Sequence, residues 1–187
     1  MSSGYRLIFI GFILILLDFR INTFDLLPDF IGYIFVINGL NGLSVKGSAF
    51  EKAKPLAILL LFLSLPSLFG FWENSLDTKS LAIFPVVYEF VLGLSHLIMM
   101  YLIFAGTWEM ATKYEDEEWG QHLKSRWNLY AIVNLLFLCM YALSYNFPTI
   151  KPLIIVLIIV VLIVEIVAIV LIKKSELRSE RWRVIKE

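Results

Sequence analysis

The feature that most constrains this sequence is the segment 152–172, which is almost entirely isoleucine, valine and leucine and contains one charged residue, Glu165. β-Branched residues favour strands in water, but 21 residues with a single charge are long enough to cross a bilayer as a helix. The composition agrees, since 59% of the 187 residues are hydrophobic and 17% are charged, against about 45–50% and about 25% in soluble domains. We therefore expect an integral protein of the cell membrane.

Five more apolar segments have the length and composition of membrane helices, and some of them begin with proline, which suits the first helical position. The six expected helices cover residues 5–21, 28–43, 55–71, 81–106, 127–145 and 152–172. The sequence thus predicts an all-α, polytopic bundle of six transmembrane helices, formed by residues 1–172. Residues 173–187 are expected to form a basic cytoplasmic juxtamembrane tail.

The distribution of basic residues predicts the orientation. With the N-terminus in the cytoplasm and six crossings, three basic residues fall outside, namely Arg20, Lys79 and Lys151. The other 13 of the 16 lysines and arginines fall inside. Loops that carry an excess of lysine and arginine stay in the cytoplasm. We therefore expect a multi-pass protein with both termini in the cytoplasm.

Two glycines in the expected helix 28–43 indicate a helix–helix contact. Gly32 and Gly39 are seven residues apart, so they share one face of the helix. Glycine on one face lets the backbones of two membrane helices approach closely.

A charged turn lies between the first two apolar segments and contains Asp18, Arg20, Asp25 and Asp29. With six spans it faces outward, and we expect capping of the second helix, an offset of its dipole and pairing of Arg20 with a carboxylate. Binding of a cation or a solute is the alternative. A re-entrant hairpin of the first two helices would leave four spans with the same charge distribution. It would bring these charges to membrane depth, which only a water-filled cavity tolerates.

The segment 25–33 reads D-L-L-P-D-F-I-G-Y. It resembles a D-[IL]-L-P-D-F-I-G-Y signature of an uncharacterised family of small bacterial integral membrane proteins. The resemblance covers roughly residues 20–43. It implies a bacterial membrane protein and carries no activity.

Polar residues inside the expected spans are the candidate functional site, because charges in the membrane are costly. Counting along the helices places His96, Glu165, Asn134 and Asn38 in one layer, about 3–5 Å to the cytoplasmic side of the midplane. Glu89 lies about 7 Å to the outer side. One interpretation is a proton or ion relay. The other is hydrogen bonding that holds the helices together.

The C-terminal tail combines basic residues with a few apolar ones, Leu177 among them. This pattern predicts a helix that lies on anionic lipid. The alternative is a charge excess that only fixes the topology. The candidate lipid-facing residues are Lys173, Lys174, Arg178, Arg181 and Arg183.

Signatures of enzymes and metal sites are missing. There is no H-E-x-x-H, G-x-S-x-G or phosphate-binding loop, and Cys139 is the single cysteine. We expect no catalytic residue, metal or cofactor, and the zero net charge gives no general attraction to nucleic acid. An intramembrane enzyme using Glu89 and Glu165 is the third hypothesis, although about 11 Å separates their depths.

The leading functional expectation is a non-enzymatic membrane protein with a regulatory, interaction or protective role exerted through helix contacts. Its expected partners are the lipid bilayer and another membrane protein. The alternative is a small proton-linked solute transporter, or the substrate-binding subunit of one, that uses Glu89, His96 and Glu165.

Overall fold

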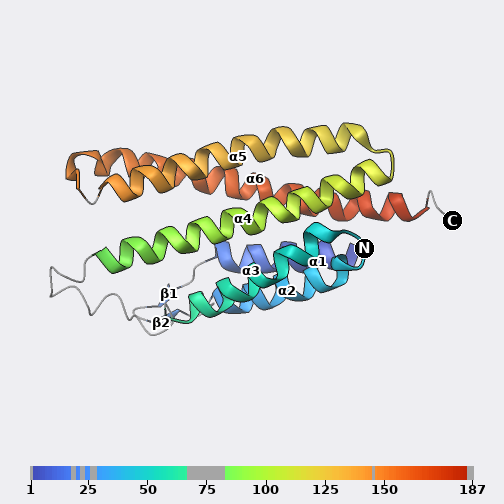
Figure 1. Ribbon diagram of the computed structural model, residues 1–187, viewed down its shortest axis with the longest axis horizontal. Coiled ribbons are helices and arrows are strands. Elements are labelled where there is room, and N and C mark those ends of the chain that lie inside the picture. The colour runs from blue at the N-terminus through green and yellow to red at the C-terminus, as the bar shows by residue number, and fades with distance from the viewer. Residues whose placement is uncertain are drawn as a thin grey trace.

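The computed structural model is all-helical apart from one short hairpin, and it describes residues 2–17, 20–21, 24–25, 29–66, 83–144 and 146–184. These residues form six α-helices (Figure 1). The helices are α1 Ser2–Leu16, α2 Asp29–Ser44, α3 Ser48–Ser64, α4 Ile83–Lys113, α5 Glu117–Ser144 and α6 Lys151–Val184. Strands β1 (Arg20–Ile21) and β2 (Phe24–Asp25) pair antiparallel between α1 and α2, and the 3-10 turn Pro148–Ile150 precedes α6.

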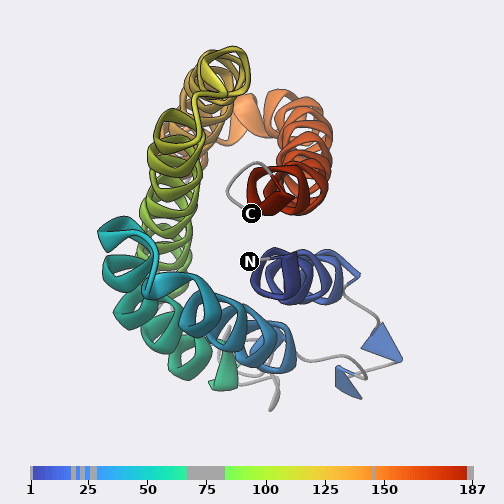
Figure 2. The same ribbon diagram turned by 90° about the vertical axis from the view of Figure 1, so that its right-hand side faces the viewer.

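The helices form a closed ring. Each one packs against the next in the chain, and α6 packs against α1, as the end-on view shows (Figure 2). Large apolar side chains fill the contacts between them, because every helix turns part of its surface toward its two neighbours. The side chains without exposed surface include Ile8, Val36, Leu60, Met99 and Ile103.

Three of the six helices, α4, α5 and α6, are long and apolar enough to span a membrane. At 1.5 Å per residue they are about 42–51 Å long, whereas α1, α2 and α3 are about 22–26 Å long. The hydrocarbon core of a bilayer is about 30 Å thick. The long helices are therefore longer than the hydrocarbon core is thick.

The long helices have charged ends that the hydropathy pattern left outside them. The hydropathy pattern predicts that the sixth helix ends at residue 172 and that the fifth begins at residue 127. In the structure α6 continues to Val184, and α5 already begins at Glu117. A drop in hydropathy marks where an apolar environment ends. A backbone in water remains helical when its side chains still have a surface to pack on.

One end of the ring gathers both chain termini. Figure 1 shows the N-terminus, the C-terminal end of α6, the α2–α3 turn and the α4–α5 turn on the same side of the molecule. The hairpin β1–β2 and the turn before α6 lie at the opposite side. The helices therefore run alternately up and down.

Helices α1 and α2 meet through glycines. A Cβ atom on Gly39 would lie 2.6 Å from the carbonyl oxygen of Gly4, and one on Gly4 would lie 2.9 Å from the carbonyl oxygen of Gly39. The two backbones are therefore in direct contact. This confirms the prediction that the Gly32 and Gly39 face of α2 is a helix contact, and it identifies α1 as the partner helix.

Candidate functional site: a polar contact among three long helices

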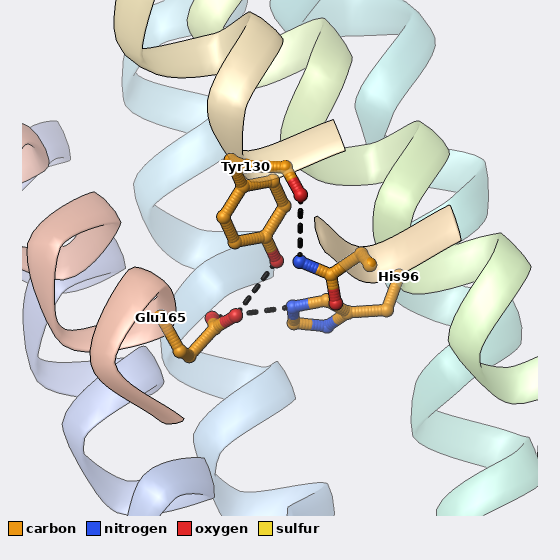
Figure 3. Close-up of polar contacts among 4 residues, drawn as sticks. His96, Tyr130 and Glu165 are labelled. Atoms are coloured by element: carbon orange, nitrogen blue, oxygen red, sulfur yellow. Dashed lines mark hydrogen bonds and ion pairs between the residues drawn. The ribbon is translucent and has the colours of Figure 1, made fainter. Parts of the chain in front are cut away.

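Side chains from the three long helices meet at Glu165 on α6. The Tyr130 hydroxyl on α5 donates a hydrogen bond to Glu165 Oε2 at 2.7 Å. Nε2 of His96 on α4 lies 3.4 Å from the other carboxyl oxygen, Oε1. Figure 3 shows the phenol and the imidazole both directed at this carboxyl group. We call these three residues the polar contact.

The polar contact is largely enclosed, with 20% of the His96 side chain and 15% of the Glu165 side chain exposed. Phe12 of α1 meets the imidazole edge-on, with ring centroids 5.7 Å apart and an interplanar angle of 78°. Tyr130 is buried. The Glu165 carboxyl group thus contacts side chains of α4 and α5, and α1 packs against the imidazole.

The position of the polar contact along the helices follows from counting residues to the nearest basic ones. Tyr130 is four residues from Arg126 on α5, which is about 6 Å. Glu165 is eight residues from Lys173 on α6, which is about 12 Å. Both residues therefore lie within the apolar part of their helices.

The sequence-predicted layer is brought together in part. His96 and Glu165 are in contact, as described above. Asn134 lies one turn from Tyr130 and donates its amide to the Tyr130 carbonyl oxygen at 3.0 Å, so it bonds to its own helix. Asn38 on α2 is exposed, and Glu89 is exposed on α4, seven residues or about 10 Å from His96. Neither of these two is part of the polar contact.

Tyr130 is the member that sequence reasoning missed. The fifth helix was expected to begin at residue 127, so a tyrosine at 130 lay close to its expected end, where aromatic residues act as anchors. With α5 beginning at Glu117, Tyr130 lies near the middle of the helix. Its spacing from Asn134, one helical turn, was the signal that could have included it.

Part of the charged turn between α1 and α2 is described, namely the backbone of Arg20 and Asp25 and the residue Asp29. The hairpin register places Arg20 opposite Asp25 across β1 and β2. Asp29 is the first residue of α2, where a carboxylate offsets the helix dipole, as predicted. Asp18 and the side chains of residues 20 and 25 lie outside the described residues.

The predicted lipid-facing tail is the last part of α6, and some of its basic residues contact carboxylates. Lys173 bonds Glu176 at 2.5 Å. Arg178 Nη1 bonds both carboxyl oxygens of Asp116, at 2.9 and 3.0 Å. Lys174 and Arg181 are exposed, and the Arg183 side chain lies outside the described residues.

The carboxyl group of Asp116 is also held by an aromatic residue. Trp182 Nε1 donates to Asp116 Oδ2 at 3.0 Å, and the Trp182 ring stacks on Tyr114 with centroids 5.6 Å apart. The end of α6 is thereby fixed to the α4–α5 turn. We call the set of Tyr114, Asp116, Arg178 and Trp182 the turn clasp.

The chemistry open to the polar contact is that of one carboxyl group, one imidazole and one phenol. A carboxyl group and an imidazole in contact can exchange a proton. The same hydrogen bonds can hold helices together in a membrane. Among the residues that the structure describes, no group of three histidine, cysteine, aspartate or glutamate side chains could hold a metal ion. No protein-family model, curated protein or solved structure matches this chain.

Proposed function

We propose that this chain is a multi-pass protein of the cell membrane with six spans and both termini in the cytoplasm. Support comes from the bias of basic residues toward the side that carries the termini, the α2–α3 turn and the α4–α5 turn. The short helices α1, α2 and α3 cross with local thinning of the bilayer, which a short apolar helix induces at modest cost.

We further propose that its role is non-enzymatic and is exerted through helix contacts, as in a regulatory, interacting or protective membrane protein. The observation that carries this proposal is that both oxygens of the Glu165 carboxyl group contact side chains of other helices. One of its oxygens accepts a hydrogen bond from Tyr130 of α5, and the other contacts His96 of α4. Glu165 therefore ties together the three helices that are long enough to span a membrane.

A stability measurement on purified full-length protein tests this role. Glu165→Gln retains an acceptor for Tyr130 but removes the charge that faces His96. Glu165→Ala removes both contacts. We call a Glu165 that only holds the three helices together a structural lock. If Glu165 is such a lock, Glu165→Ala lowers the melting temperature more than Glu165→Gln does. The wild-type protein then conducts no protons. Equal stability of all three proteins would contradict the lock.

The second candidate is proton-linked solute transport, and the imidazole–carboxyl contact in the apolar part of the helices favours it. Such groups in a membrane commonly mark proton pathways. Glu89 lies about 10 Å from His96 along α4 and is the candidate outer acceptor.

Reconstitution in vesicles with an internal pH dye separates the two candidates. Transport predicts solute-dependent acidification that Glu165→Gln and His96→Ala abolish while the protein remains folded. The lock predicts that acidification is absent from the wild type and from both variants. Glu89→Gln then tests the outer acceptor by the same readout.

A further inference from the structure

A groove opens between α4 and α5 with a volume of about 180 Å³. It lies beside the polar contact, because the ring of Trp127, which lines the groove, is 5.7 Å from the Tyr130 ring. Its lining is aromatic, with Tyr101, Phe104 and Trp108 from α4 and Trp127 from α5. The Trp127 ring lies 5.3 Å from that of Tyr101 and 6.0 Å from that of Phe104. Ala105 also lines the groove, and its small side chain leaves space between these rings.

The polar lining of the groove is cationic. Lys124 and Asn128 are four residues apart on α5, so they share one face of the helix, and both are exposed. The Lys124 ammonium group lies 4.7 Å from the centroid of the Trp108 ring. Among the described residues Lys124 forms no ion pair, so its charge is available to an anion.

The groove crosses the level at which the helices change from polar to apolar. Lys124 is near the last charged residues before the apolar part of α5, and Trp108 lies near the charged end of α4. Tyr101 is about 10 Å further along α4, in the apolar part. Tryptophan with lysine is typical of the headgroup level of a membrane. One end of the groove is therefore at the headgroups and the other is in hydrocarbon.

We propose that this groove binds one anionic phospholipid. The phosphate contacts the Lys124 ammonium group beside Trp108, and the first part of one acyl chain lies along Tyr101, Phe104 and Ala105. The volume is below the roughly 300–1,000 Å³ of small-molecule sites, so it holds a segment of a chain and not a whole soluble ligand. With the proposed orientation the lipid comes from the cytoplasmic leaflet, which carries the anionic lipids.

The site differs from the lipid-facing tail that the sequence predicted. It lies on α4 and α5, and Lys124 is not a member of the tail. Arg126 provides a matched control on the same helix, because residues two apart do not share a face. Arg126 is exposed and is not part of the groove.

Native mass spectrometry of the full-length protein with phosphatidylglycerol and phosphatidylcholine of identical chains tests the proposal. The wild type is expected to retain phosphatidylglycerol about fivefold better, the factor that one basic residue contributes near an anionic surface. Lys124→Ala abolishes this preference, whereas Arg126→Ala keeps it. Ala105→Leu fills the groove and lowers retention of both lipids.

Three results would overturn the proposal. The first is a wild type without headgroup preference, and the second is an equal loss in Lys124→Ala and Arg126→Ala. The third is a dimer that Ala105→Leu dissociates, which would show that a second copy of the chain occupies the groove. The measurement uses purified protein, so its outcome is independent of the orientation and of any transport assay.

Discussion

Gly11 of α1 and Gly32 of α2 face each other at backbone contact. A Cβ atom on Gly11 would lie 2.5 Å from the carbonyl oxygen of Gly32, and one on Gly32 would lie 2.7 Å from the carbonyl oxygen of Gly11. With the contact of Gly4 and Gly39, this gives two reciprocal glycine pairs, seven residues apart on each helix. The pairs fix the register of α1 against α2, because a shifted pairing would bring larger side chains to the closest approach.

Gly11→Ala is expected to destabilise the protein by about 1–3 kcal/mol, the usual cost of overpacking a close contact. The added methyl group meets a backbone oxygen, which cannot move without separating the helices. Gly42→Ala is the control, since its Cβ would find its nearest heavy atom at 3.7 Å. Thermal unfolding in detergent should show a lower melting temperature for Gly11→Ala alone. The same loss in both variants would contradict the close contact.

Tyr130→Phe is expected to cost about 0.6–2 kcal/mol, the range for a hydrogen bond between membrane helices. The change removes the hydroxyl that donates to Glu165 and keeps the ring. Tyr141→Phe is the control on the same helix, because its hydroxyl makes no hydrogen bond among the described residues, while its ring stacks on Phe137. A melting temperature unchanged by Tyr130→Phe would contradict a stabilising role for this bond.

Asp116→Ala is expected to free the end of α6, because Asp116 binds both Arg178 and Trp182 in the turn clasp. The ion pair of Asp116 with Arg178 is partly exposed, so its loss costs about 1 kcal/mol and decreases with salt. Hydrogen exchange of residues 176–184 should become faster. Glu118→Ala removes an exposed carboxylate of the same α5 end and should leave this exchange unchanged. Equal exchange in both variants would show that the clasp does not hold α6.

A pair of cysteine variants tests the orientation. Val45 lies in the α2–α3 turn and Asn146 lies near the turn before α6, at opposite ends of the ring, and both are exposed. In a Cys139→Ala background, an impermeant maleimide added to intact cells should label Asn146→Cys and not Val45→Cys. Permeabilised cells should show labelling of both. The reverse pattern would place the termini outside.

Part of this arrangement could be predicted from the sequence. The apolar segments gave the six helices, and counting depths brought His96 and Glu165 to one level, where the structure places them in contact. Depth does not include the direction in which a side chain points around its helix. Asn38 was therefore assigned to the same level as His96, although its side chain is exposed and does not reach the polar contact.

The parts that could not be predicted depend on contacts between distant segments. The last turns of α6 are polar and give no hydropathy signal, and they are ordered because Ser179 and Trp182 are buried against other helices. Gly4 and Gly11 are informative only when α1 is known to lie against α2. Tyr130 could be assigned only after the start of α5 was known.

Ring closure has a consequence for biosynthesis. The helix that completes the circle, α6, is synthesised after the other five, and it carries the carboxyl group that contacts both His96 and Tyr130. Until α6 packs between α5 and α1, a newly made chain holds the His96 imidazole and the Tyr130 phenol without Glu165. A chain truncated before α6 therefore leaves Tyr130 without its hydrogen-bond acceptor and His96 without its carboxyl contact.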